Sequence, residues 1–206
     1  MILFMFSAAV FANISISNSV QKDTISGIIY VDQEDHIYIE VKHPVHQIFT
    51  FRGDTLLLYY PDDRKAFLFS EFNPMELPVS RALLGSGKEF DLSTYGFRFL
   101  KKKSKGDTTL SYWKKEEGGT VVLKNLKDKL IEILILHNGK EVGKTTYSDY
   151  REGKGLHIPS RIHSQINTKN GILTEDVTFT DVQFLDAFPD SLKHIKIPED
   201  VEVKGW

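Results

Sequence analysis

The stretch at residues 49–69, FTFRGDTLLLYYPDDRKAFLF, decides the fold because short apolar runs alternate in it with turn-forming residues. Successive side chains of a strand point to opposite faces of a sheet. The run TLLLYY is therefore apolar on both faces of the strand that it predicts. One face has to meet the core, and the other has to meet a covering helix or a ligand.

The same alternation of strand and turn continues on both sides of this stretch. Upstream, TISGIIYVD and HIYIEVK are joined by QED. Downstream, Asn138-Gly139 and Asn170-Gly171 are strong hairpin signals between further apolar runs. The spacing of 8 to 12 residues predicts a mainly β protein with one curved antiparallel sheet, an incomplete β-barrel of about ten to eleven strands.

Helix signals are few and concentrate in one long excursion. In NPMELPVSRALLGSG, Asn73 is suited to cap a helix, Pro74 suits its first position and Gly85 suits its end. A second short turn is expected in KEFDLSTYG. One or two short helices are thus expected between Asn73 and Tyr95, and the absence of a linker or repeat indicates one domain.

Strand parity assigns the faces of the predicted sheet. In HIYIEVK, Ile37, Ile39 and Val41 share one face, whereas Tyr38 and Glu40 share the other, so one face is expected to be dry and one wet. Several runs carry more apolar bulk than one buried face requires. One or two short helices are too few to fill the concave side, so the extra bulk lines a sandwich core or a cavity.

Composition excludes several function classes. The chain of 206 residues has a formal net charge of -2, which argues against a nucleic-acid-binding protein. It has no cysteine, and it contains neither G-x-S-x-G nor H-E-x-x-H. No nucleophile and base form a recognisable pair, so no catalytic residue, cofactor or metal site is predicted. His43 and His46 flank Pro44 on opposite faces, and His157 and His163 have no carboxylate at a fixed offset, so all four are interpreted as surface residues.

The N-terminus indicates export. The segment MILFMFSAAVFA is apolar through Phe11 and ends on the small residue Ala12. An apolar run of this length before a polar segment is typical of a secretory signal peptide, here residues 1–12, with Asn13 as the first mature residue. No Lys or Arg precedes the run. The alternatives are a true start that lies upstream, a buried strand or an uncleaved anchor.

One basic cluster stands out, RFLKKKSK from Arg98 to Lys105. It suits an anionic lipid surface or an acidic partner. A charged hairpin that protects a strand edge is the more common use of such a sequence.

Taken in order, these segments resemble the periplasmic outer-membrane lipoprotein carrier (LolA) family. The resemblance rests on Gly27 at the first strand, on Pro44 in IEVKHP, on GDTLLLYYP, and on the ending from Pro198 to Val201, and it spans Thr24 to the end. The chain departs from the family at His43, where an arginine that holds the lid is usual, and at residues 13–23, which lack the periodicity of the family's first helix.

The resemblance implies a periplasmic, non-enzymatic carrier formed by residues 13–206. Such a monomer binds the acyl chains of lipoproteins or lipids, receives them from an ATP-driven inner-membrane complex and passes them to an outer-membrane acceptor. The expected cavity residues, from parity and apolar bulk, are Ile37, Ile39, Val41, Phe49, Phe51, Leu56, Leu58, Tyr60, Phe67, Phe69, Ile133, Ile135, Val177 and Phe179. The expected lid residues are Met75, Leu77, Leu83 and Leu84, with His43 as the lid contact.

Two other functions remain open at this level. An exported lipid-sensing or structural β-domain that binds a protein partner has the same sequence features. An outer-membrane β-barrel is also strand-rich and exported, but RIHSQINT has no outward apolar band.

Overall fold

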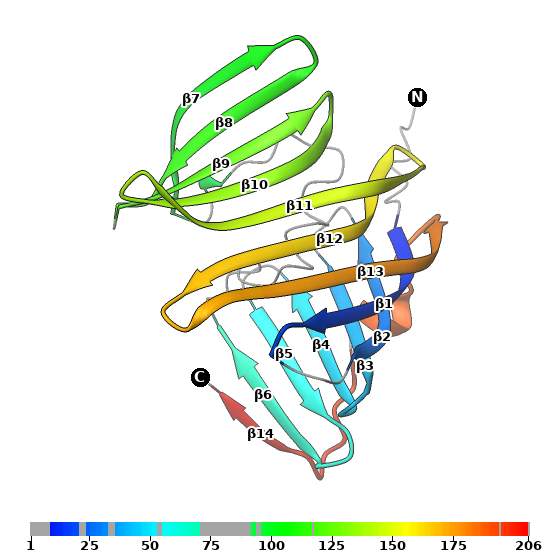
Figure 1. Cartoon of the computed structure of the whole chain (residues 1–206). Helices are drawn as coiled ribbons and strands as arrows, with labels where there is room; N and C mark the ends of the chain where they lie inside the picture. Colours follow the sequence, from blue (N-terminus) through cyan, green and yellow to red (C-terminus); the bar gives the residue numbers. More distant parts are fainter. Residues whose placement is uncertain are drawn as a thin grey trace.

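The computed structural model describes residues 9–20, 24–32, 36–52, 55–70, 92–93, 96–116, 118–193 and 195–205. These residues form one curved sheet of 14 strands, which is open at both ends (Figure 1). The predicted open antiparallel sheet is confirmed, and the number of strands is higher than the ten to eleven expected. Among the described residues, no helix has the length and apolar character that a membrane span requires.

The strands of the first half are β1 (Ala9–Asn18), β2 (Ile25–Asp32), β3 (Ile37–His43), β4 (Gln47–Arg52), β5 (Thr55–Tyr60) and β6 (Lys65–Phe69). Those of the second half are β7 (Arg98–Lys105), β8 (Thr108–Lys114), β9 (Gly119–Leu126), β10 (Lys129–His137), β11 (Lys140–Gly153), β12 (Leu156–Thr168) and β13 (Gly171–Leu185). The chain ends with helix α2 (Asp190–Lys193) and strand β14 (Glu202–Gly205).

Strand β1 joins the two halves of the sheet. The strand order is β14-β6-β5-β4-β3-β2-β1-β13-β12-β11-β10-β9-β8-β7, so β1 lies between β2 and β13. All pairings are antiparallel except that of β14 with β6. β6 and β7 consequently lie near opposite ends of the sheet order, although they follow one another among the strands that the structure describes.

Part of the segment assigned to the signal peptide lies in β1. Ala9, Val10 and Ala12 are buried there, and Ala12 pairs with Ile29 of β2. The strand continues through Asn18 with the alternation of Ile14 and Ile16, which both pack in the core. Residues 13–18 are thus a strand, in agreement with their lack of helical periodicity. Residues 1–8 lie outside the described part of the chain.

Turn chemistry explains the hairpins of the second half. Asn138 and Gly139 both have positive φ, 51° and 76°, as the predicted two-residue turn between β10 and β11 requires. Lys154 and Gly155 form the same kind of turn between β11 and β12. The predicted hairpin at Asn170-Gly171 also forms, with Thr168 opposite Gly171.

Pro159 lies within a strand, where proline is uncommon. It lies buried inside β12, opposite Tyr150 of β11. Next to this pair, Asp149 has a φ of 55°, and no ladder pair joins it to Ser160. A proline is tolerated in a sheet where the ladder is already irregular, because its missing N–H is not needed there.

Candidate functional site

The apolar side chains of both halves gather on one face of the sheet, here called the inner face. Its buried core includes Ile29 of β2, Ile39 of β3, Ile133 of β10, Ile162 of β12 and Val177 of β13, each at most 6% exposed. Alternation places them there because every second residue of a strand points to the same side. A single continuous apolar surface therefore extends across twelve strands, from β6 to β8.

Most of the predicted cavity residues are brought together on the inner face. The buried members of this cluster are Ile37, Ile39, Val41, Phe51, Leu56, Ile133, Val177 and Phe179. Partly buried residues that pack against it are Phe49, Phe69 and Ile135. The remaining three are half-buried at positions of the same parity on β5 and β6: Leu58, Tyr60 and Phe67. Tyr60 and Phe67 meet edge to face, with ring centroids 6.0 Å apart.

The predicted lid is described only at its end. Met75, Leu77, Leu83 and Leu84 lie outside the described residues. Leu92, from the same excursion, is completely buried in the inner-face cluster, and Phe97 packs against it. His43 lies exposed at the end of β3.

The inner face also carries polar groups that sequence reasoning missed. Thr145 of β11 and Ser164 of β12 are buried, and their hydroxyl oxygens lie 3.0 Å apart. Trp113 Nε1 and Ser160 Oγ are buried without a hydrogen-bond partner in the described part of the chain. A buried polar group normally finds a partner, so these two groups are free to hydrogen-bond to an oxygen atom of a ligand. In the sequence, Trp113 and Ser160 alternate with outward-facing residues of their strands, and this pattern could have identified them as inner-face residues.

Two hollows open beside this apolar surface. One, of about 440 Å³, is lined by Tyr150, Ser160 and Phe179, with the ion pair of Arg161 and Asp149 (3.2 Å) at its edge. The other, of about 840 Å³, lies at the base of the β7–β8 hairpin. It is lined by Ser93, Gly96, Phe97, Arg98, Lys114, Lys115 and Glu116. Both volumes are within the range of roughly 300–1,000 Å³ typical of ligand sites.

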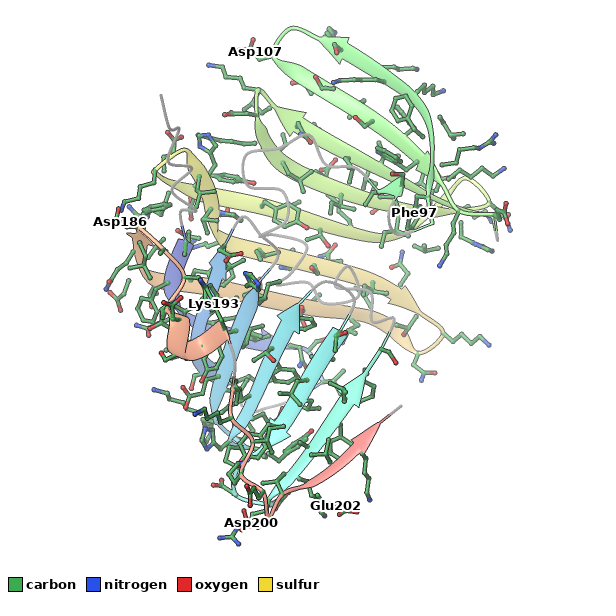
Figure 2. The ribbon with its side chains drawn as sticks, turned by 180° about the vertical axis from the view of Figure 1, so that it is seen from behind. Phe97, Asp107, Asp186, Lys193, Asp200 and Glu202 are labelled. Atoms are coloured by element: carbon green, nitrogen blue, oxygen red, sulfur yellow. The ribbon has the colours of Figure 1, made fainter. Side chains whose placement is uncertain are left out.

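The opposite face is not uniformly wet, which corrects the assignment made from HIYIEVK. Tyr38 is only 6% exposed, because Phe188 and the partly buried Leu192 of α2 pack over it and its neighbours. Figure 2 shows α2, marked by Lys193, lying against this side of the sheet. Further along, the same face is polar and carries the ion pair of Lys144 with Glu132 (3.0 Å).

The histidines have carboxylate partners that the sequence does not reveal. His46 Nε2 lies 3.1 Å from Glu40, and His163 Nδ1 lies 2.7 Å from Asp176 of the neighbouring strand. His157 Nε2 lies 2.8 Å from Asp128. These partners come from strand pairing or turns, so a fixed offset in sequence could not find them. No group of three ligating side chains suited to a metal ion occurs in the part of the chain that the structure describes.

We expect the protein to lose stability in alkali because of one buried tyrosine, Tyr38, and one partly buried tyrosine, Tyr150. Burial raises the pKa of Tyr38, with a further contribution from Glu40, and burial raises the pKa of Tyr150, whose hydroxyl donates to the Leu130 carbonyl. An unfolded tyrosine titrates near pH 10, so above that pH the folded state binds more protons than the unfolded state. Stability that is complete below pH 10 is therefore lost as the pH rises.

The expected loss is up to about 1.4 kcal/mol of unfolding free energy per pH unit above 10 for each tyrosine. Urea unfolding at a series of alkaline pH values measures this slope. Tyr150→Phe should remove about half of it. An identical slope in that variant would contradict the assignment.

No family model matches the sequence, and no curated protein matches it. Solved structures do resemble the fold. A LolA superfamily protein from Nitrosomonas europaea superposes with a TM-score of 0.56 at 14% identity, covering 94% of this chain and 90% of that one. A putative outer membrane lipoprotein-sorting protein domain from Vibrio parahaemolyticus gives 0.59 at 11% identity, covering 89% and 88%.

A third similar structure is that of a DUF1329 family protein from Desulfovibrio piger. It superposes with a TM-score of 0.60 at 12% identity, covering 90% of this chain and 89% of that one. All three matches extend over nearly the whole length of both chains, and at such identities they establish architecture alone. The chain has a LolA-like fold.

Proposed function

We propose that this chain is a periplasmic carrier that binds the acyl chains of lipoproteins or lipids on its inner face and moves them from the inner to the outer membrane. The observation that carries the proposal is the continuous apolar inner face of an open sheet. The shared fold with a LolA superfamily protein and a lipoprotein-sorting domain supports it. The role is binding and release, without an enzymatic reaction.

Partners and location are part of the same proposal. The monomer would receive its cargo from an ATP-driven inner-membrane complex and give it to an outer-membrane acceptor. Export would use residues 1–12 as a signal peptide. Cleavage after Ala12 would leave residues 13–18 of β1, which still pair with β2 and β13.

Energetics favour a carrier with an open mouth. An acyl chain of about 15 methylenes, at roughly 0.8 kcal/mol each, gains about 12 kcal/mol on burial before ordering costs. Full burial would make release slow. In an open sheet, part of the acyl chain stays in contact with water, so an acceptor can take the acyl chain directly.

Native mass spectrometry of the chain purified from an exporting host, with organic extraction of what travels with it, tests the proposal. The expected result is near-stoichiometric acylated lipid or lipoprotein on a protein that begins at Asn13. A bare mass, together with failure to take up a fluorescent fatty acid, would contradict the carrier function. The apolar inner face would then serve as a core, and a protein-binding domain would be the better description.

A further inference from the structure

The β7–β8 hairpin concentrates positive charge at one end of the sheet. Residues 98–115 contain seven basic residues and one acidic residue, Asp107, in a chain whose net charge is -2. β7 is an end strand of the sheet, and all eight of its residues are exposed. Figure 2 shows Asp107 at the hairpin tip, at the far end of the molecule from Asp200 and Glu202 near β14.

Two lysines of β7, Lys101 and Lys103, lie over the same aromatic ring. Lys101 Nζ and Lys103 Nζ lie 5.0 Å and 6.0 Å from the centroid of the Tyr112 ring. Neither lysine forms an ion pair with a carboxylate in the described ranges of the chain. Neighbouring like charges repel one another, so this arrangement becomes favourable when an anionic surface lies against it.

Exposed apolar side chains are interspersed with these cations. Phe99 is 49% exposed and Leu100 is 42% exposed, between Arg98 and Lys101. The register shift between Phe99 and Lys101 leaves Leu100 without a partner on β8. Charges alone suffice to protect a strand edge from aggregation, and large exposed apolar residues work against that purpose. Cations that flank exposed Phe and Leu are typical of a segment that lies in a membrane interface.

The hairpin is connected to the inner face by aromatic contacts. Phe99 meets Trp113 edge to face, with ring centroids 5.2 Å apart, and Trp113 belongs to the inner-face cluster. The 840 Å³ hollow beside it brings Arg98, Lys114 and Lys115 together with the Phe97 ring. A lipid that follows this path has apolar side chains for its acyl chain and cations for an anionic headgroup.

We propose that the β7–β8 hairpin docks the protein on the surface of an anionic lipid bilayer, so that lipid passes between the bilayer and the inner face beside Phe99 and Trp113. This inference rests on the proposed carrier function and identifies the membrane surface at which the carrier would meet the inner-membrane complex or the outer-membrane acceptor. An acidic protein partner is the competing occupant. The exposed Phe99 and Leu100 favour the bilayer, because apolar side chains gain little from an acidic peptide.

Vesicle flotation tests the docking. The unmodified protein is expected to float with phosphatidylcholine vesicles that contain phosphatidylglycerol, to ignore pure phosphatidylcholine, and to bind less at high salt. Each cation at an anionic surface strengthens binding by about fivefold. The double variant Lys101→Glu/Lys103→Glu should therefore bind at least about 25-fold more weakly. Phe99→Ser/Leu100→Ser should also weaken binding, although the charge is unchanged.

A matched control separates docking from net charge. Lys42 of β3 and Lys65 of β6 are exposed lysines in the other half of the sheet. The double variant Lys42→Glu/Lys65→Glu makes the same change in charge and should float like the unmodified protein. An equal loss in this control would overturn the proposal. Failure of the unmodified protein to float, while it binds poly-glutamate, would also overturn it and assign the hairpin to an acidic protein partner.

Uptake of a fluorescent fatty acid from solution distinguishes this inference from the carrier function. The Lys101→Glu/Lys103→Glu variant should take up the soluble fatty acid normally, because neither lysine belongs to the inner-face cluster. A protein that takes up fatty acid but does not float would refute the docking alone. A protein that floats but takes up no fatty acid would refute the carrier function on which the lipid path rests.

Discussion

Replacing Phe69 with glutamate is expected to weaken acyl-chain binding at least a hundredfold while the sheet stays folded. Phe69 lies on β6, packs against the inner-face cluster from its margin and is only partly buried. A carboxylate at this position would face the acyl chain. Its desolvation, together with the loss of apolar contact, costs roughly 3 kcal/mol or more, which corresponds to about a hundredfold in affinity.

The neighbouring residue provides the matched control. Leu68 belongs to the same strand, points to the opposite face and is 42% exposed. Leu68→Glu should leave binding unchanged, since its new charge is in solvent. Titration with a fluorescent fatty acid measures affinity, and circular dichroism reports whether each variant is folded.

A second inner-face variant tests the same ligand site in case the Phe69→Glu protein does not fold. Leu58 is half-buried on β5, opposite Phe67 of β6. Leu58→Glu should reproduce the loss of binding. Full binding in folded Phe69→Glu and Leu58→Glu proteins would refute the inner face as the ligand site, and so would an equal loss in Leu68→Glu.

Replacing Gly27 with alanine is expected to destabilise the protein by about 3 kcal/mol or more, or to prevent folding. A Cβ at Gly27 would lie 2.0 Å from the carbonyl oxygen of Glu40 and 2.9 Å from the Cα of Val41. The register of β2 and β3 shifts between Ser26 and Gly27, which brings the two backbones together there. Backbone atoms of a paired strand cannot give way as a flexible side chain can.

Gly143 on β11 is the control for this prediction. A Cβ there would have its nearest contacts at 3.5 Å, with the carbonyl oxygen of Gln165 and with Cδ1 of Ile135. Gly143→Ala should change the unfolding free energy by less than about 1 kcal/mol, because these are ordinary van der Waals contacts. Urea unfolding of both variants gives the comparison. Equal stability of the two would mean that β2 and β3 do not approach closely at Gly27.

Local pattern was sufficient for most of the sheet and for much of the candidate site. The parity of Ile37, Ile39 and Val41 predicted which face of β3 meets the core, and all three are buried there. The Asn138-Gly139 turn was predictable because its two positive φ values need just these residue types. Such features depend on neighbours within a few residues, and sequence reasoning has access to those.

Features that depend on distant segments were missed. The first residues of β1 have the composition of a signal peptide, so a buried strand was only the alternative interpretation, and their pairing with β2 and β13 was not predicted. Tyr38 was assigned to a wet face because the covering Phe188 follows 150 residues later in the chain. His163 obtains its carboxylate from Asp176 across a strand pair.

The sequence by itself determined the element type, the turns and the apolar parity, because backbone sterics and the two-residue repeat of a strand act locally. Only the tertiary structure decided the strand order, the cover on the outer face, the close approach at Gly27 and the continuity of the inner face with the basic hairpin. These depend on long-range pairing, in which each strand edge and face finds a partner that local pattern does not specify.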